Sequence, residues 1–304
     1  MIKRTVEISG SGTRFFLKND QIVLKRKGEK IGQIPSEDIG IMIIDCPDAV
    51  YTHASLVRLA EQGCVVVFCG SNHLPISMVL PYAANSLIVK RLSIQLKAGV
   101  PKKKRLWQQI VQQKILNQAA NLNNDFSERT FLLTLAKRVR SGDPDNLEAQ
   151  AARHYWKFWL HEQPFQRDRN GPPPNNLLNY GYAIIRAAVA RAICGAGLNP
   201  SIGLHHKNRG DAFCLASDIM EPLRPLVDRV VRGLHLEGID TIDKESKKRI
   251  LMILAEPIEL FQSKGPLLVE LQRTAASLVR CFEGNERRLE LPKLLKVTKH
   301  QIAV

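Results

Sequence analysis

The feature that most constrains the fold is a change in the spacing of apolar residues near residue 80 of this 304-residue chain. Before this point the apolar residues come in short β-branched or aromatic runs, such as residues 39–44, and Gly, Asn-Asp or Pro-Ser separates the runs. Runs of this kind are typical of β-strands. After Pro81 the apolar residues recur at helical spacing over longer segments, which indicates helices. The sequence therefore predicts an α+β protein in which a small β-rich part precedes a larger helical part.

Residues 1–80 make up the predicted β-rich domain. Asn19 and Asp20 stand between two strand-like runs and predict a tight hairpin. Residues 53–62 have apolar positions at helical spacing and are followed by Gly63, so we expect one helix there. The predicted strands are residues 5–8, 14–17, 21–24, 39–44 and the buried run 64–69.

The rest of the chain is predicted to contain a linker, a helical domain and a tail. The linker is residues 81–90, the all-α domain is 91–286, and the basic tail is 287–304. Asp143 as N-cap and Pro144 at the first helical position mark the start of one helix. The other expected helices are residues 91–98, a long helix after residue 101, residues 127–140 and 177–196, and two between 242 and 282.

The charge balance narrows the choice of partner. The chain has 44 Lys and Arg against 29 Asp and Glu, a formal charge of +15, which favours nucleic acid or an anionic membrane surface. No apolar run approaches the ~20 residues that span a bilayer, and the first residues lack the apolar stretch of a signal peptide. The six cysteines form no C-x-x-C pair and are expected to be buried free thiols. We therefore expect a cytoplasmic protein that binds nucleic acid and makes no membrane contact.

The segment 203–228 carries the densest group of chemically active residues. His205 and His206 precede Asp218, Glu221 and Arg224, which recur every three residues and so share one helical face. Imidazole nitrogens and carboxylate oxygens suit divalent metals such as Mn, Mg or Zn. The same pattern also fits an ordinary salt-bridged helix beside solvated histidines, and spacing alone leaves both interpretations open.

A third acid, Glu148, strengthens the metal interpretation. Helical spacing places it on the same face as Ala152, Tyr155 and Trp159, which are apolar or aromatic. A carboxylate on such a face is costly unless a cation, a proton or a metal offsets its charge. It is predicted either to bind a metal or to pair with an arginine from another helix.

Several basic residues are candidates for phosphate contacts. The cluster 102–105 at a helix start either meets phosphates or is a solvated charged run, and both alternatives stay open. The Pro-rich stretch 163–176 is predicted to be an exposed loop in which Arg167 and Arg169 could meet nucleic acid. The predicted phosphate contacts are Lys207, Arg209, Arg224, Arg186, Lys102, Lys103, Lys104 and Arg105.

Four stretches in order resemble one known family. They are NLEAQAARHYW at 146–156, LNYGYAIIR at 178–186, IGLHH at 202–206 and LASDIMEPLRPLVD at 215–228. After a small β-rich domain, this order is similar to the Cas1 family of CRISPR-associated integrases, which insert new spacers. Within this family, the sequence resembles the members from type II systems, which have a large RNA-guided nuclease. The resemblance spans nearly the whole chain, and the D-I-M-E-P-x-R-P block is its most specific part.

The resemblance implies three metal ligands that are also the catalytic residues. Glu148 matches the glutamate of the family's E-G-x-A-A motif, and Glu221 matches the acid of D-x-M-E-P. The family histidine stands three residues after a glycine, which from Gly203 selects His206. The implied cofactor is Mg²⁺ or Mn²⁺, and the ligand set also accepts Zn²⁺.

Supporting roles fall to two neighbours of these ligands. Asp218 matches a family acid near the metal, and His205 competes with His206 for the histidine assignment. Ala149 departs from the family glycine after the glutamate, a mild change because Ala fits a helix better than Gly.

The resemblance also implies an assembly and a reaction. The amino-terminal domain would be β-sandwich-like and would form a homodimer, and a Cas2 dimer would bridge two such dimers into a heterohexamer. A free DNA 3′-hydroxyl would attack a phosphodiester at the boundary of the CRISPR repeat, so double-stranded DNA is both donor and target. The RNA-guided nuclease of type II systems is a further candidate partner. Two alternatives remain, a basic helical DNA-binding scaffold without catalysis and a plain metal-dependent nuclease for branched DNA.

The sequence argues against two other enzyme classes. It contains no glycine-rich phosphate-binding loop, and its serines, histidines and aspartates follow no order that supports a hydrolase triad.

Overall fold

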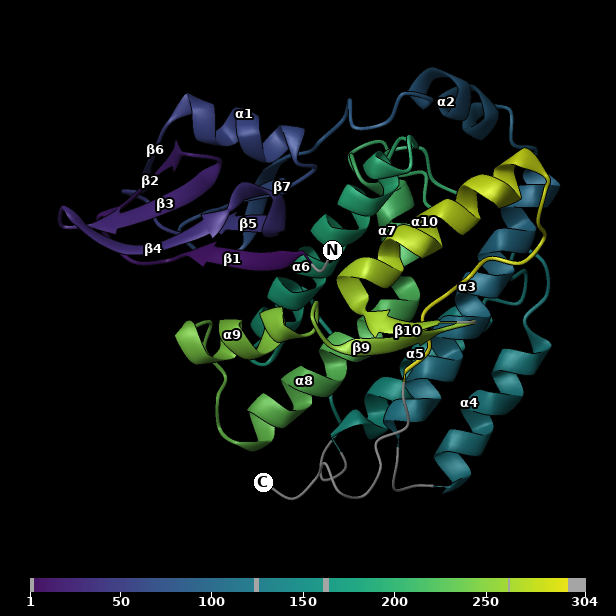
Figure 1. The fold of residues 1–304 in the computed structure, drawn as a ribbon. Helices are drawn as coiled ribbons and strands as arrows, with labels where there is room; N and C mark the ends of the chain where they lie inside the picture. Colours follow the sequence, from purple (N-terminus) through teal and green to yellow (C-terminus); the bar gives the residue numbers. More distant parts are fainter. Residues whose placement is uncertain (1–2, 123–125, 161–163, 262, 295–304) are drawn as a thin grey trace.

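The computed structural model describes residues 3–122, 126–160, 164–261 and 263–294. A β-rich amino-terminal region lies beside a larger helical region, as Figure 1 shows. The predicted α+β class, with a helical carboxy-terminal region, is therefore confirmed. Within the described residues, no helix is both long and apolar enough to cross a membrane.

Two four-stranded sheets build the amino-terminal region. One has the order β1-β5-β7-β8 and the other β4-β3-β2-β6. Phe15 and Ile22 of the second sheet pack with Met42 and Val66 of the first in one buried cluster, which gives the predicted sandwich-like arrangement. The bounds are β1 Arg4–Ile8, β2 Thr13–Lys18, β3 Gln21–Arg26, β4 Glu29–Pro35, β5 Ile39–Ile44, β6 Val50–Tyr51, β7 Val65–Cys69 and β8 Pro75–Val79, with a 3₁₀ turn η1 at Ser36–Asp38 and helix α1 at His53–Glu61.

Strand β5 is apolar on both faces because it serves two cores. Met42 and Ile44 face the sandwich core, whereas Ile41 and Ile43 belong to the core of the helical region. Successive side chains of a strand point to opposite faces, so this alternation explains the unbroken apolar run. The first sheet therefore packs directly against the helices.

The helical region is built around α6 (Asn175–Gly195), which is buried along most of its length. It packs against β7 and β8 on one side and against α7, α8, α9 and α10 on others. The remaining elements are α2 Ile88–Leu96, α3 Val100–Asn121, α4 Phe126–Arg138, α5 Leu147–Trp159, α7 Cys214–Met220, the 3₁₀ turn η2 Glu221–Leu223, α8 Arg224–Leu236, α9 Lys244–Met252, β9 Pro257–Leu260, β10 Ser263–Pro266 and α10 Leu267–Glu283.

The helical region differs from the sequence expectation in several details. Helix α2 begins at Ile88, inside the predicted linker 81–90. Between α9 and α10 the chain forms a two-stranded antiparallel sheet, β9 and β10, where only a break between helices was expected. The first part of the predicted tail packs on this region, because Leu289 and Leu291 are buried and Lys293 pairs with Glu259 of β9. Residues 295–304 of that tail lie outside the described residues.

Helix α5 begins at Leu147 and not at the predicted Pro144. The predicted cap is nevertheless present, because the Asp143 carboxylate accepts backbone N–H bonds from Leu147 and Glu148 at 2.9 Å each. Asp143 and Asn146 both have positive φ, so the chain makes a tight turn between the capping carboxylate and the helix. This cap fixes the helix end that carries Glu148.

Candidate active site

A polar cavity of about 290 Å³ lies among α3, α5, α6 and the segment 205–228. Its described lining includes Glu148 from α5, His206 from a loop and Glu221 from η2, so the three predicted ligands share one cavity. A larger cavity of about 450 Å³ lies beside Arg91 and Arg191, and none of these ligands is among its described lining residues. The chemistry of the lining, and not the size, therefore selects the smaller cavity as the candidate site.

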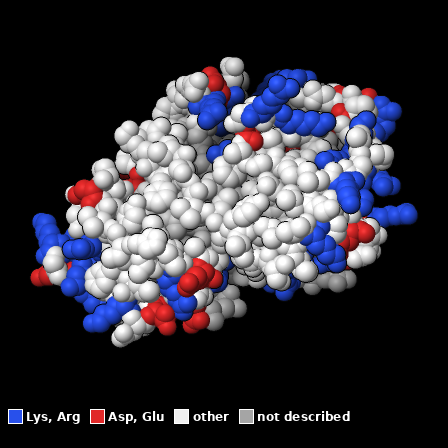
Figure 2. Space-filling model, turned by 90° about the horizontal axis from the view of Figure 1, so that it is seen from above, with Lys and Arg blue, Asp and Glu red and all other residues white. Residues whose placement is uncertain are grey.

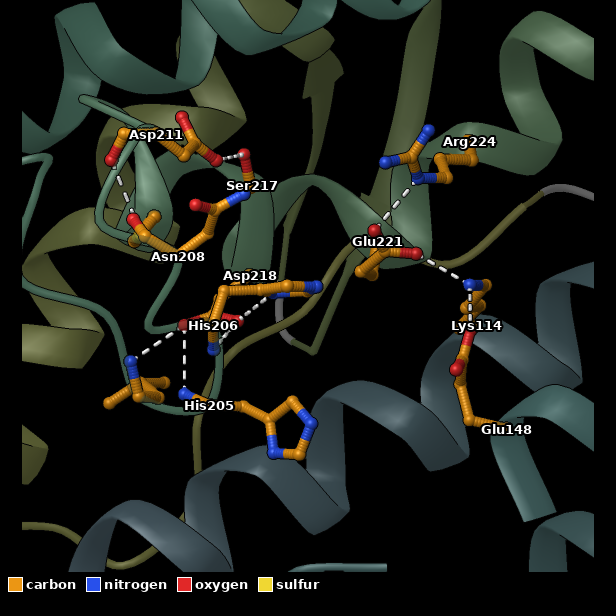
Figure 3. Close-up of polar contacts among 12 residues, drawn as sticks. Lys114, Glu148, His205, His206, Asn208, Asp211, Ser217, Asp218, Glu221 and Arg224 are labelled. Carbon is orange, nitrogen blue, oxygen red and sulfur yellow. Dashed lines mark hydrogen bonds and ion pairs between the residues drawn. The ribbon is translucent and has the colours of Figure 1, made fainter. Parts of the chain in front are cut away.

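Lys114 of α3 joins the two glutamates. Its Nζ lies 2.5 Å from Oε2 of Glu221 and also contacts Oε1 of Glu148 (Figure 3). Burial alone would lower the pKa of Lys114, but Glu221 and Glu148 outweigh burial and raise it, so the side chain is a cation. The alternative partner predicted for Glu148 was an arginine, and that detail is wrong because its partner is this lysine.

Glu221 has a second cationic partner. Nε of Arg224 lies 2.8 Å from Oε1 of Glu221. Burial alone would raise the pKa of Glu221, but Arg224 and Lys114 hold it at about 2. The Arg224 guanidinium also lies over the Tyr182 ring, 4.5 Å from its centroid, in a cation–π contact. Glu221 is therefore a buried carboxylate anion with one cation at each oxygen.

One ring nitrogen of His206 is held by Asp218. Nδ1 of His206 lies 2.5 Å from Oδ1 of Asp218. Asp218 is fully buried and also accepts backbone N–H bonds from Leu204, His205 and His206 at 2.6, 3.0 and 3.2 Å. Asp218 therefore shapes the loop that carries both histidines, residues 203–209, which we call the histidine loop. This agrees with the predicted supporting role of Asp218.

Gly203 explains why the loop can fold so closely over Asp218. A Cβ atom on this residue would stand 2.4 Å from the backbone oxygen of His206 and 3.0 Å from Oδ2 of Asp218. Real Cβ atoms do not approach backbone that closely, so the position requires glycine. The spacing of three residues between Gly203 and His206 thus has a steric cause.

His205 occupies a different environment from His206. Its ring stacks on Trp107 of α3 with centroids 4.2 Å apart and planes 2° apart. Burial lowers the pKa of His205, whereas the hydrogen bond to Asp218 raises the pKa of His206. Both imidazoles line the same cavity, but only His206 has a carboxylate to orient its ring.

Three acidic or basic residues of the described cavity lining were not predicted as site residues. Lys114 lies on the stripe of α3 shared by Trp107 and Ile110, and a lysine on that stripe was a detectable signal. Arg167 was expected on an exposed loop, but it donates 2.8 Å and 2.5 Å bonds to Asn175 and Asn179 and faces the cavity. The third is Asp228, which accepts a hydrogen bond from the Tyr182 hydroxyl and whose pKa burial raises to about 7.

The predicted phosphate contacts are spread over several surfaces. Lys207 and Arg209 are exposed on the histidine loop. Arg186 lies 5.5 Å from the ring centroid of Phe213, outside the described lining of the cavity. Within the 102–105 cluster, Lys102 donates a 2.7 Å bond to the carbonyl of Phe282, and the other members, Lys103, Lys104 and Arg105, are half-buried or exposed. Figure 2 shows Lys and Arg gathered toward the two ends of one face.

The donor set of the cavity suits a divalent cation. Among the described residues, no three His, Cys, Asp or Glu side chains already surround one point at ligand distance. Glu148 and Glu221 do share a single cation, the Lys114 ammonium, so their oxygens converge on one place. Carboxylate oxygens and an imidazole in one cavity are ligands that Mg²⁺ and Mn²⁺ accept. The assignment of Glu148, His206 and Glu221 as ligands stays a prediction.

The fold and the cavity together define a class of protein, one in which a sandwich-like domain precedes a helical domain that carries a carboxylate and imidazole centre. Solved structures share this fold. A casposase bound to its integration product superposes with a TM-score of 0.78 at 17% identity, covering 98% of this chain and 97% of the other. A chain of a Cas6-RT-Cas1–Cas2 complex superposes with a TM-score of 0.76 at 19% identity, covering 98% of this chain and 36% of that chain.

The sequence comparisons identify the family. The model of the CRISPR associated protein Cas1 family matches residues 6–252. The CRISPR-associated endonuclease Cas1 of Neisseria meningitidis serogroup C is 36% identical over 297 residues, which is 96% of each chain. The chain therefore belongs to the Cas1 family, and the predicted resemblance is confirmed.

Proposed function

We propose that this protein is a metal-dependent DNA integrase and endonuclease of CRISPR adaptation. It joins the 3′-hydroxyl ends of spacer-precursor DNA to the CRISPR repeat. The observation that carries the proposal is the convergence of Glu148 and Glu221 on one cation in a cavity that also contains both histidines. Membership of a family whose relative is named an endonuclease supports the same activity.

The reaction is a transesterification at phosphorus. The 3′-oxygen of the donor forms a bond to the target phosphorus, the bond from phosphorus to the target 3′-oxygen breaks, and the leaving oxygen takes up a proton. A divalent ion held by Glu148, His206 and Glu221 would bind a phosphate oxygen and favour loss of the proton from the attacking hydroxyl. With water in place of the hydroxyl, the same site hydrolyses DNA.

The chain's own residues orient and neutralise the reacting groups. Asp218 accepts a hydrogen bond from Nδ1 of His206, and in the neutral imidazole this tautomer places the free lone pair on Nε2. Arg167 and Arg224 both lie near the Tyr182 ring at the cavity and place positive charge where a phosphate would sit. The net charge of +15 supports binding of duplex DNA through its backbone.

The proposed assembly follows the structural neighbours. One of them is a complex that contains Cas1 and Cas2, and we propose a Cas2 dimer as the bridge between two homodimers of this chain. The sandwich-like domain is the proposed dimer contact. The RNA-guided nuclease of type II systems is a further proposed partner in donor selection.

A strand-transfer assay tests the proposal. A labelled duplex is incubated with a repeat-containing plasmid, with and without the Cas2 partner, and with Mg²⁺ or Mn²⁺. Glu148→Gln and Glu221→Gln should each reduce joining by more than about 100-fold, since even residues that only orient metal ligands contribute ~10–100-fold. Glu237→Gln is a matched control, because Glu237 is exposed and pairs with Arg249 at the far end of α8. Joining that persists in both site variants would overturn the proposal.

The products and the DNA affinity separate this function from the two alternatives. Integration leaves the donor strand covalently attached to the plasmid, whereas a plain nuclease leaves only shortened strands. A non-catalytic scaffold would bind DNA and give neither product. We expect attached strands from the wild-type protein, and DNA binding that survives both glutamate substitutions.

A further inference from the structure

Lys114 occupies the place between the carboxylates of Glu148 and Glu221. Its Nζ contacts one oxygen of each glutamate, and the lysine is 7% exposed. The two glutamates come from α5 and η2, and the lysine reaches them from α3, so three separate elements meet at one ammonium group (Figure 3). The ammonium group is therefore the cation around which the two carboxylates are arranged.

The ammonium and a metal ion would compete for the same oxygens. The carboxylates of buried Glu221 and half-buried Glu148 face one ammonium group, and they need a positive charge between them because a buried, uncompensated carboxylate is costly. A divalent ion in contact with both oxygens would repel an ammonium group only a few ångströms away. One of the two cations must therefore leave when the other binds.

The two cations around Glu221 differ in how firmly they are held. Arg224 has a further contact with the Tyr182 ring through its planar guanidinium, whereas Lys114 ends in a compact ammonium group on a flexible stem of four methylene groups. No hydrogen bond of the Lys114 ammonium is described other than those to the two glutamates. The lysine is thus the cation that can move away, and Arg224 can stay on the opposite oxygen of Glu221.

We propose that Lys114 is a positioning residue that holds Glu148 and Glu221 in place in the metal-free protein and is displaced when a divalent ion binds. The proposal rests on the proposed function, since it assumes that these glutamates are metal ligands. The lysine offsets the repulsion between the two carboxylates and keeps them prearranged until the metal arrives. It also weakens metal binding, because the ion must displace it.

The chain contains a matched control for this lysine. Lys247 is 5% exposed and its Nζ also bridges two carboxylates, Glu7 at 2.9 Å and Asp45 at 2.7 Å. This second bridge lies between α9 and the amino-terminal sheet, away from the cavity. Lys114→Met and Lys247→Met therefore remove the same kind of ion pair at two different places.

The test is Mn²⁺ affinity of the full chain without DNA, measured from the electron paramagnetic resonance of free Mn²⁺. Lys114→Met should bind Mn²⁺ at least about tenfold more tightly than the wild-type protein, because the competing charge is gone. Lys247→Met should bind with wild-type affinity. Lys114→Arg, which keeps a cation, should not gain affinity. An unchanged Mn²⁺ affinity in Lys114→Met would overturn the proposal.

A second readout uses the wild-type protein and so does not depend on a variant that folds. Acetylation of lysines followed by mass spectrometry reports whether each ammonium group is accessible. Saturating Mg²⁺ should increase the reactivity of Lys114 several-fold and leave Lys247 unchanged. Equal protection of Lys114 with and without Mg²⁺ would contradict displacement.

The two proposals fail in different ways. If the wild-type protein binds Mn²⁺, and Glu148→Gln and Glu221→Gln abolish that binding while Lys114→Met leaves it unchanged, only the role of Lys114 is wrong. If neither the wild-type protein nor Lys114→Met binds Mn²⁺, both the displacement and the metal-dependent function fall together.

Discussion

His206 and Asp218 are joined by a 2.5 Å contact between Nδ1 and Oδ1, and the same carboxylate accepts three backbone N–H bonds from the histidine loop. One fully buried side chain thus sets both the course of the loop and the orientation of the ring. Much of the site's geometry depends on this residue, although it is not itself a predicted ligand.

Replacing Asp218 should therefore affect stability as well as activity. Asp218→Ala leaves buried N–H groups without an acceptor, and we expect a loss of about 3 kcal/mol in the free energy of unfolding. Asp211→Ala is the comparison, because half-buried Asp211 bonds Phe213 and Ser217 at the same loop and should cost only about 1 kcal/mol. Urea denaturation measures both. Equal losses would show that the loop does not depend on Asp218.

The two histidines should respond differently to substitution. His206→Ala should abolish Mn²⁺-dependent strand transfer, because the oriented imidazole is lost. His205→Ala should keep a substantial part of the activity, because this ring stacks on Trp107. Strand transfer at saturating Mn²⁺ gives the comparison. Equal loss in both variants would remove the reason for preferring His206 as the ligand.

Asp228 should make stability depend on pH. Burial raises its pKa from 3.8 to about 7, so in this range the folded protein binds more protons than the unfolded chain. The contribution of Asp228 is fully present below its unfolded pKa and is lost as the pH rises through about 7, with an upper bound of about 4 kcal/mol.

Asp228→Asn should flatten this dependence, since the amide cannot ionise. We expect the free energy of unfolding of the wild-type protein to fall more steeply than that of the variant between about pH 4 and about pH 7. Asp20→Asn on the exposed β2–β3 hairpin should leave the wild-type slope unchanged. Identical slopes in the wild-type protein and Asp228→Asn would contradict the buried, proton-binding state.

Lys207 and Arg209 should contribute to DNA binding without regard to sequence. Each exposed cation that meets a phosphate releases a counterion, so Lys207→Ala and Arg209→Ala should each reduce the salt dependence of the affinity by a slope of about 1. Lys248→Ala on α9 is the control, since this exposed lysine lies away from the cavity. DNA affinity measured across a salt series tests whether these two residues contact phosphates. An unchanged slope in both loop variants would show that neither residue contacts the DNA backbone.

Local features of the amino-terminal domain could be read from the sequence. The hairpin at Asn19 and Asp20 has positive φ at both residues, which these two residue types tolerate. Strand β5 matches its predicted bounds because its two buried faces leave an unbroken apolar run. Strands β9 and β10 were missed because PIEL and SKGP carry Pro and Gly, and the sheet forms through their pairing.

The site could be predicted only in part, because its contacts connect distant positions. Helical spacing and family motifs singled out Glu148 and Glu221 as candidate site residues. They did not predict the Lys114 ammonium group that joins the two carboxylates. Lys114 lies 34 positions before the first glutamate and 107 before the second, and no local pattern connects such positions. Arg167 was placed in a loop correctly, yet its bonds to Asn175 and Asn179 bring it to the cavity.

Anomalous diffraction from crystals grown with Mn²⁺ tests most directly whether Glu148, His206 and Glu221 form one metal centre. We predict a peak in the cavity of about 290 Å³, within ligand distance of both glutamates and of the His206 ring, with Lys114 moved away. A peak elsewhere, or Mn²⁺ absent from the cavity while Lys114 still bridges the two carboxylates, would contradict the account.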